Sequence, residues 1–325
     1  MKRTFLWAAL LLNGTAPALA CTGISFTARD GAFVTARTIE WGESPLPSGY
    51  VVIPRQHETV SYTPTGANGL LFYFPHYGKY PAYDSTRNDR TLSDLQYVAW
   101  ILSQFSSVDE VKAATQTVRV VSIDPSVGST VHWRIADASG KQVVLEFIDG
   151  EPRFYDNEVG VLTNSPDFPW QITNLNNYVN LHPGNAEAQR IGNVRIFPFG
   201  AGSVFLGIPG DVTPPSRFVR SAFYKATAPA CETGLDAVLQ SFHILNNFDI
   251  PIGIEHPEGH APDIPSATQW TSAIDLANRR LYYKTSYNNS IRCIDLKKID
   301  FARIGYQAHP LDTIQQQPIE ELSIS

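Results

Sequence analysis

Two segments of alternating apolar and polar residues flank Asp30-Gly31 near the start of the chain. They run from Thr22 to Ala28 and from Ala32 to Glu40. An Asp-Gly dipeptide between two such segments is the strongest short signal for an antiparallel hairpin. A two-residue turn at this dipeptide would place Cys21 opposite Glu40. The sequence therefore predicts an early hairpin that brings a carboxylate beside a cysteine.

Arg37, on the second strand of this hairpin, lies three residues before Glu40. Successive side chains of a strand point to opposite faces of the sheet. A regular strand would therefore direct Arg37 and Glu40 to opposite faces. Both reach one site only if the strand end twists or bulges.

The first twenty residues have the three parts of a bacterial secretory signal peptide. Lys2-Arg3 is positively charged, Phe5 to Leu12 is a short apolar run, and Ala18-Leu19-Ala20 is a small-x-small cleavage site. The run is too short to span a membrane, and no later apolar run is long enough. We expect residues 1–20 to be removed, and the mature chain to begin at Cys21 and to be secreted or periplasmic.

Three roles are open for Cys21. The first is lipid attachment, although a lipoprotein signal has Leu where this chain has Ala18. The second is a nucleophile whose own α-amine serves as base, because in peptides an α-amine has a pKa of about 7.7–8.0 and a thiol one of about 8.5. The third is a structural cysteine. Together with Cys231 and Cys293 the cysteines are odd in number, and whether those two pair stays open.

Composition limits the class of protein. About three hundred residues follow position 20, and 43% of the chain is hydrophobic, which allows one large domain with a sizeable core. The net charge of −6 argues against a nucleic acid or an anionic membrane as partner. We therefore expect a single domain over 21–325, with no nucleic-acid partner and no membrane span.

The rest of the chain switches between helix and strand patterns. Helical spacing or a helix-start signal marks 91–105, the segment from Ser107, 217–226 and 232–246. Alternation marks 118–155, with turns at 139–140 and 149–150, and also 270–286 and 290–296. Antiparallel strands with grouped helices predict an α+β fold in which helices cover sheets.

Four motifs occur in order along the chain. They are Cys-Thr at 21–22, ARTIEWG at 36–42, VLTNSPDFPWQITNLNNY at 161–178 and GIPGDVTPPSRFVR at 207–220. Together they resemble the choloylglycine hydrolase / penicillin V acylase family of N-terminal-nucleophile cysteine amidases. The resemblance implies a four-layer αββα sandwich of the Ntn-hydrolase type, hydrolysis of linear amides, and no cofactor or metal.

The resemblance also implies a role for each matched residue. Cys21 matches the nucleophile, and Arg37 lies near the thiol and favours its thiolate. Glu40 accepts hydrogen bonds from the N-terminal amine. Asn164 donates its side-chain amide to the oxyanion, and Arg217 belongs to the polar network near the nucleophile.

A stretch rich in aromatic residues supplies the remaining site residues. The backbone N–H of Tyr73 matches the family's second oxyanion donor. Tyr77, Tyr80 and Tyr83 lie near Gly and Pro; they either pack on the core or line a pocket for an apolar acyl group. The expected partner is a small-molecule amide with an apolar acyl part, and the resemblance implies a homotetramer.

One segment departs from the family pattern. Between YVVIPR at 50–55 and GLLFYFPHYG at 69–78 the chain is shorter by about one central β-hairpin. A missing hairpin would leave apolar surface unburied, at about 25 cal/mol per Å² against a net stability of about 5–15 kcal/mol. We expect lower stability than in full-length relatives, and weak or absent activity.

The substrate is the least determined feature. The RTIEWG form resembles the choloylglycine hydrolase branch of the family, which implies conjugated bile salts. The alternatives are penicillin V, N-acyl-homoserine lactones, or a catalytically impaired binding protein or lipoprotein of the same fold. His256 and His260 have zinc-like spacing, but Pro257 and Gly259 between them favour a loop over a metal site.

Overall fold

A computed structural model describes residues 21–40, 47–56, 90–122, 131–255, 259 and 267–324. Several predictions fall outside these residues, namely those for the signal peptide, for the shortened segment after Arg55, for Tyr73, Tyr77, Tyr80 and Tyr83, and for the pair His256 and His260.

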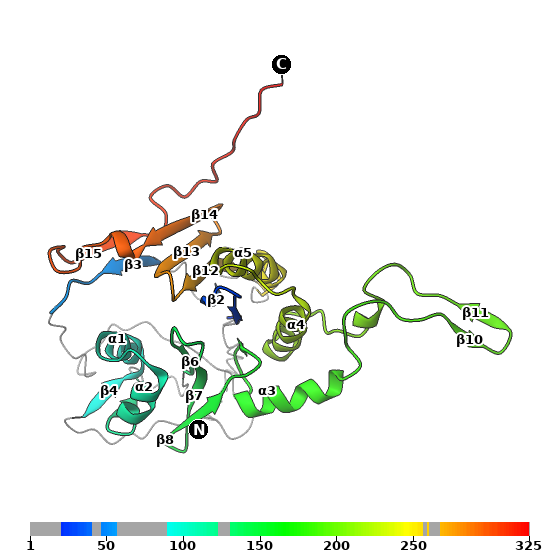
Figure 1. Cartoon of the computed structure of the whole chain (residues 1–325), viewed down its shortest axis with the longest axis horizontal. Helices are drawn as coiled ribbons and strands as arrows, with labels where there is room; N and C mark the ends of the chain where they lie inside the picture. The colour runs from blue at the N-terminus through cyan, green and yellow to red at the C-terminus, as the bar shows by residue number, and fades with distance from the viewer. Residues whose placement is uncertain are drawn as a thin grey trace, which may run out of the picture.

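A six-stranded antiparallel sheet contains the N-terminal hairpin at its centre (Figure 1). Its order is β14-β13-β12-β2-β1-β9. The strands are β1 (Gly23–Thr27), β2 (Phe33–Glu40), β9 (Val161–Leu162), β12 (Thr268–Asp275), β13 (Arg280–Thr285) and β14 (Asn288–Asp295). Both ends of the chain thus contribute to one sheet.

A second sheet is the predicted meander, with β6 (Trp133–Ala136), β7 (Gln142–Ile148) and β8 (Glu151–Asp156) joined by turns at the expected dipeptides. The five central residues of β7 are all buried. Burial on both faces follows because β7 lies between helices on one side and the six-stranded sheet on the other.

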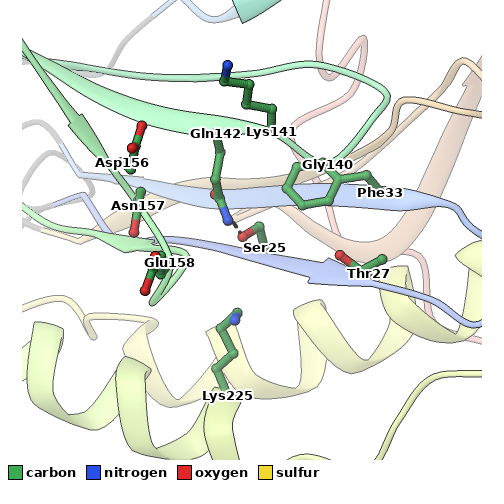
Figure 2. Close-up of a pocket in the computed structure, with 10 residues that line it drawn as sticks. All are labelled: Ser25, Thr27, Phe33, Gly140, Lys141, Gln142, Asp156, Asn157, Glu158 and Lys225. Atoms are coloured by element: carbon green, nitrogen blue, oxygen red, sulfur yellow. Dashed lines mark hydrogen bonds between the residues drawn. The ribbon is translucent and has the colours of Figure 1, made fainter.

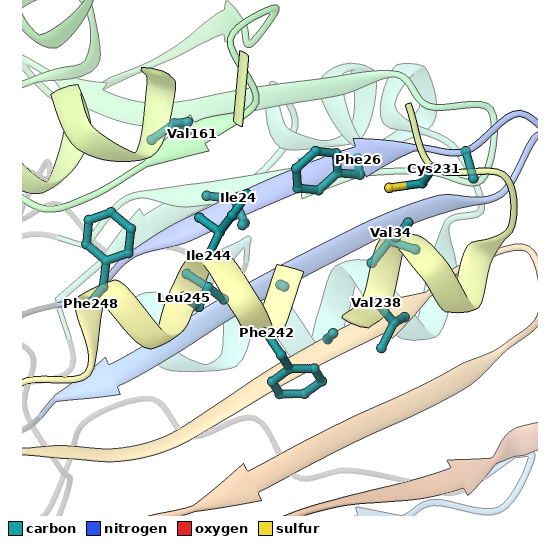
Figure 3. Close-up of a cluster of buried hydrophobic side chains, with 14 of the residues drawn as sticks. Ile24, Phe26, Val34, Val161, Cys231, Val238, Phe242, Ile244, Leu245 and Phe248 are labelled. Atoms are coloured by element: carbon teal, nitrogen blue, oxygen red, sulfur yellow. The ribbon is translucent and has the colours of Figure 1, made fainter. Parts of the chain in front are cut away.

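Helices cover the outer face of each sheet, which gives the expected αββα order (Figure 1). One pair is α4 (Pro214–Thr227) and α5 (Gly234–Leu245), over the six-stranded sheet. The other is α1 (Asp94–Gln104) and α2 (Val108–Thr115), over the meander. Figure 3 shows α5 lying across β1 and β2, with Val238 and Leu245 near Ile24 and Val34.

The helix starts follow the side chains that the sequence offers. Ser93 caps α1 by accepting from the Gln96 N–H, and Ser107 forms the predicted capping box with Glu110.

Short elements complete the fold. They are β3 (Gly49–Val52) paired with β15 (Gln307–Pro310), β4 (Thr91–Ser93) with β5 (Arg119–Val121), β10 (Gln189–Ile191) with β11 (Val194–Ile196), helix α3 (Phe168–Asn174), and 3-10 turns Leu175–Tyr178, Ser203–Phe205, Asn246–Phe248 and Leu296–Lys298.

The predicted register of the first hairpin was wrong by one residue. The connection has three residues rather than two, because the Ala28 N–H bonds the Ala32 carbonyl at 2.9 Å. Gly31 adopts a φ of +84°, which glycine tolerates without strain. The Asp30 carboxylate accepts from the Gly234 N–H at 3.0 Å, so the loop is tied to the start of α5.

This shift changes what faces the cysteine. Gly23 lies opposite Arg37, and the Thr38 N–H bonds the Thr22 carbonyl at 2.9 Å, so Cys21 does not lie opposite Glu40. A one-residue slip exchanges the faces of all side chains on a strand. The carboxylate is therefore brought near the N-terminal residues by another route, described below.

A substitution at Gly234 tests how tightly α5 packs against the sheet. A Cβ there would lie 2.3 Å from Asp275 Oδ2 and 2.9 Å from the Ala32 Cβ. We expect Gly234→Ala to lower the free energy of unfolding by about 1–3 kcal/mol through overpacking. Gly210→Ala is the matched control, because nothing lies within 4 Å of its added Cβ. Equal urea midpoints for the two variants would contradict the tight packing.

Candidate active site

Three segments far apart in the sequence meet at Cys21. The first is the start of β1, which pairs with β2 on one side and with β9 on the other. The second is the turn after β9, which carries Asn164. The third is the first turn of α4, which carries Arg217. Pro214 at the start of α4 favours helix initiation there, and the Thr163 hydroxyl donates to its carbonyl at 3.0 Å.

The polar atoms of Cys21 each have a partner. Arg37 Nη2 lies 3.1 Å from the thiol Sγ. The Cys21 nitrogen donates to Asn164 Oδ1 at 2.9 Å, and its carbonyl accepts from Arg217 Nη1 at 2.7 Å. The half-buried cysteine is thus held by its backbone, while its sulfur faces a cation.

Arg217 connects the three segments. Its side chain is 1% exposed, and it donates to the Thr22 hydroxyl at 2.7 Å, to Asn164 Oδ1 at 2.8 Å and to the Val212 carbonyl at 2.8 Å, besides Cys21. Burial lowers the pKa of Arg217, and the negative charge of Glu40 opposes this effect. The planar guanidinium suits this role because it presents its donors in a fixed geometry.

The contact with Arg217 also fixes the orientation of Asn164. A guanidinium has only donors, so the atom that faces it must be the amide oxygen. The Asn164 Nδ2 group therefore points away from Arg217. The amide keeps a donor for another group near Cys21, which is the role that the family resemblance implies.

Glu40 lies on the buried side of β2. It is 2% exposed; its Oε1 lies 2.5 Å from the Thr268 hydroxyl and its Oε2 lies 3.1 Å from the Thr38 hydroxyl. Burial raises the pKa of Glu40 to about 8, against the opposing effects of the Arg217 charge and the two hydroxyls. The nitrogen of Cys21, which we expected to bond Glu40, bonds Asn164 instead.

Arg37 and Glu40 point to opposite faces, as strand alternation requires. Arg37 is exposed beside the thiol and also lies 5.8 Å from the centroid of the Trp270 ring. Glu40 reaches the N-terminal residues through Thr38, whose hydroxyl accepts from the Thr22 N–H at 3.1 Å. A bulge occurs at this point, but on the neighbouring strand β12 rather than on β2.

The sequence did not predict this set of hydroxyls, contributed by Thr22, Thr38 and Thr268. Threonine is ordinary in a strand, so no local signal marked them. Arg134 on β6 was not predicted either, although a charged residue in the middle of an alternating strand was an available signal.

Arg134 reaches from the meander to β2. It donates to the Thr35 hydroxyl and to the Ala36 carbonyl, the latter at 3.1 Å. A Cβ on Gly23 would lie 3.4 Å from its Cζ, so a glycine there leaves room for the guanidinium. Burial and the positive charge of Arg37 lower the pKa of Arg134 to about 9, which leaves it protonated at neutral pH.

This arrangement supports nucleophilic chemistry at a carbonyl carbon. It offers a thiol beside a guanidinium, a backbone nitrogen on the same residue, and an amide donor close by. Cys231 is buried and Cys293 exposed, and neither forms a disulfide. Among the residues that the structure describes, no cluster of His, Cys, Asp and Glu could hold a metal ion.

Comparisons with known proteins agree with one another. A sequence profile of the linear amide C–N hydrolases, choloylglycine hydrolase family, matches residues 65–312. The chain is 31% identical over 310 residues to the bile salt hydrolase/transferase of Clostridium perfringens, covering 86% of this chain and 93% of that protein. It is 27% identical over 252 residues to the penicillin V acylase of Pectobacterium atrosepticum, covering 72% and 61%.

A solved structure extends the similarity to the fold. The crystal structure of a mutant conjugated bile acid hydrolase from Clostridium perfringens superposes with a TM-score of 0.79 and 28% identity. The match covers 93% of this chain and 100% of that one. The layers described above are therefore those of a known hydrolase fold.

The raised pKa of Glu40 predicts how stability depends on pH. The native state holds the Glu40 proton up to about pH 8, whereas a free glutamate loses it near 4.5. The free energy of unfolding should therefore fall as the pH rises from about 5 to 8, by about 1 kcal/mol per pH unit from this group. Urea unfolding of the wild type and Glu40→Gln across this range tests it. The variant should lack this part of the slope, and equal slopes would contradict the assignment.

Proposed function

The chain belongs to the choloylglycine hydrolase family of linear amide C–N hydrolases, and we propose that it cleaves its amide through Cys21. The observation that carries the proposal is the convergence of Arg37, Asn164 and Arg217 on that one residue. A cysteine with only a structural role would not require polar contacts from three separate segments of the chain.

In the proposed reaction, removal of residues 1–20 frees the α-amine of Cys21. That amine takes the thiol proton, and the sulfur attacks the amide carbonyl carbon. Asn164 Nδ2 donates to the oxyanion, and such a donor typically contributes about 2.7–4 kcal/mol. The α-ammonium returns its proton to the departing amine, which leaves a thioester on Cys21. Water then attacks the thioester, and the acid and the free thiol are released.

We propose a conjugated bile salt as the substrate. The RTIEWG stretch, which carries Arg37 and Glu40, supports this class, and so does the similarity to a bile salt hydrolase/transferase. Penicillin V and N-acyl-homoserine lactones are the rival substrates, because each is also a secondary amide with an apolar acyl part.

Export of the mature chain is also a proposal, supported by the signal-peptide pattern of residues 1–20. Across the described part of the chain, every helix is too short or too polar to cross a bilayer. An exported chain cleaved after Ala20 would have the free amine that the proposed reaction requires.

The family resemblance also leads us to propose a homotetramer. The segment around β10 and β11 extends from the body of the molecule as an arm (Figure 1). Its apolar side chains are exposed, among them Ile191, Val194, Phe197 and Phe199, the last of them fully. Contact with other copies of the chain would bury them, at about 25 cal/mol per Å².

The double variant Val194→Ser, Phe199→Ser tests this assembly. We expect the wild type to sediment as a tetramer and the variant as smaller species. Leu102→Ser, an exposed apolar side chain on α1, is the control and should leave the assembly unchanged. A monomeric wild type would contradict the proposal.

The nucleophile is tested with Cys21→Ser and Cys21→Ala. Both should reduce hydrolysis by several orders of magnitude while the protein stays folded, because serine stays protonated at neutral pH and alanine has no nucleophile. Purified protein is incubated with glycocholate, penicillin V and a long-chain acyl-homoserine lactone, and acid release is measured. Wild-type turnover by Cys21→Ala on any of them would rule out the assignment.

The competing function is that of a binding protein or lipoprotein with the same fold. The shortened segment after Arg55 is the feature that favours it. The intact mass of the exported protein separates the two. A chain that begins at an unmodified Cys21 supports the enzyme, whereas a diacylglycerol adduct or a retained signal peptide excludes it.

A further inference from the structure

A cavity of about 480 Å³ lies at one end of the space between the two sheets (Figure 2). β1 and β2 supply Ser25, Thr27 and Phe33 to its wall, the meander supplies Gln142 and Asp156, and the turn after β8 supplies Glu158. Its size falls within the range of small-molecule sites, about 300–1,000 Å³. No residue of the proposed catalytic set lines it.

Lys225 enters this cavity from the last turn of α4. Figure 2 shows its side chain pointing from the helix toward Ser25. A Cβ on Gly160 would lie 3.1 Å from its Nζ and 2.5 Å from Ser25 Oγ, so the ammonium lies close to both residues. Its one contact of note is with the ring of Phe26, whose centroid is 5.8 Å away. Within the described ranges, no carboxylate pairs with Lys225.

Lys225 is the last of three neighbouring cations. Arg37 beside the thiol lowers the pKa of Arg134, and Arg134 in turn lowers the pKa of Lys225, in both cases in addition to burial. Neither Arg134 nor Lys225 forms an ion pair with any residue that the structure describes. Both residues are half-buried, and charges that are partly removed from water without counter-charges are unfavourable. An anion beside Lys225 would relieve this repulsion.

The other charges around the cavity are already compensated or exposed to water. Lys141 pairs with Asp109 at 2.5 Å, and Asp156 lies 4.0 Å from Lys112. Glu158 is exposed, where solvent and salt screen its charge. Of the two lysines that line the cavity, Lys225 is thus the one without an acidic partner among the described residues.

We propose that this cavity binds a small oxyanion, a carboxylate or a phosphate, through the Lys225 ammonium. Two further strands supply neutral donors to the same cavity, namely the Thr27 hydroxyl on β1 and the side-chain NH2 group of Gln142 on β7, whose amide oxygen accepts from the Ser25 hydroxyl at 3.0 Å. Oxyanion sites usually combine one charge-assisted hydrogen bond with neutral hydrogen-bond donors around it. The site lies along β1 from Cys21 and is separate from it.

Isothermal titration of the purified full chain tests the proposal. Sodium acetate and sodium phosphate are the two probes, each compared with sodium chloride at equal ionic strength so that screening is constant. We expect saturable binding of at least one oxyanion by the wild type. Lys225→Gln should weaken it about tenfold or more, and Lys225→Arg should retain it. Lys141→Gln is the matched control and should bind as the wild type does, because Lys141 already pairs with Asp109.

The outcome identifies the ligand as well. Binding of acetate alone assigns a carboxylate, binding of phosphate alone assigns a phosphate, and binding of both assigns the shared oxyanion chemistry. Lys225→Met is a second neutral variant, and melting in chloride shows whether each variant is folded. The proposal is overturned if neither probe binds the wild type, or if a folded neutral variant binds as tightly as the wild type. None of these readouts depends on amide hydrolysis.

Discussion

The buried guanidinium of Arg217 is the interaction on which the site depends. One side chain bonds the backbone of Cys21, the hydroxyl of Thr22, the amide of Asn164 and the carbonyl of Val212. A buried arginine is stable only when its donors are satisfied, so each of these partners must be in place. Removing one would leave both a charge and a polar group without a partner. This mutual dependence holds together three segments that the chain itself does not connect.

The same interaction explains how Glu40 acts at a distance from Cys21. Its carboxyl group lies in the interior with the hydroxyls of Thr38 and Thr268, near the positive charge of Arg217. Thr38 connects it to the N–H of Thr22, the residue that follows Cys21. A chain of hydrogen bonds thus leads from the Glu40 carboxyl group to the residue next to the Cys21 thiol. Arg37, on the other face of β2, places its positive charge beside the sulfur and does not pair with Glu40.

β1 also connects two sites of different character. Its first residues are held by Arg217 and Asn164, and its later residues line the cavity that Lys225 enters. Arg134 lies between them and bonds β2 from the opposite sheet. Arg134 and the bond from the Ser25 hydroxyl to Gln142 are thus polar contacts between the two sheets, in contrast to the apolar clusters under α4 and α5 and under α1 and α2.

Local sequence predicted the first hairpin, the meander and the helices α1, α2, α4 and α5, but not the short strands β10, β11 and β15 or helix α3. The meander with its two Gly turns and the capping box at Ser107 follow from spacing and turn residues, whereas the four motifs indicated the family and, through that resemblance, the αββα order. Tertiary contacts decided the rest. The bond from Asp30 to the start of α5 accompanies a three-residue loop that local turn preferences did not indicate, and this shifted the register. The threonine hydroxyls had no local signal, and the charge of Arg134 within an alternating strand did not indicate its partner, because the role of these residues arises only where distant strands meet. A sequence pattern reports what a residue does among its chain neighbours, whereas the partner of a buried polar group is chosen by whichever segment the fold places against it.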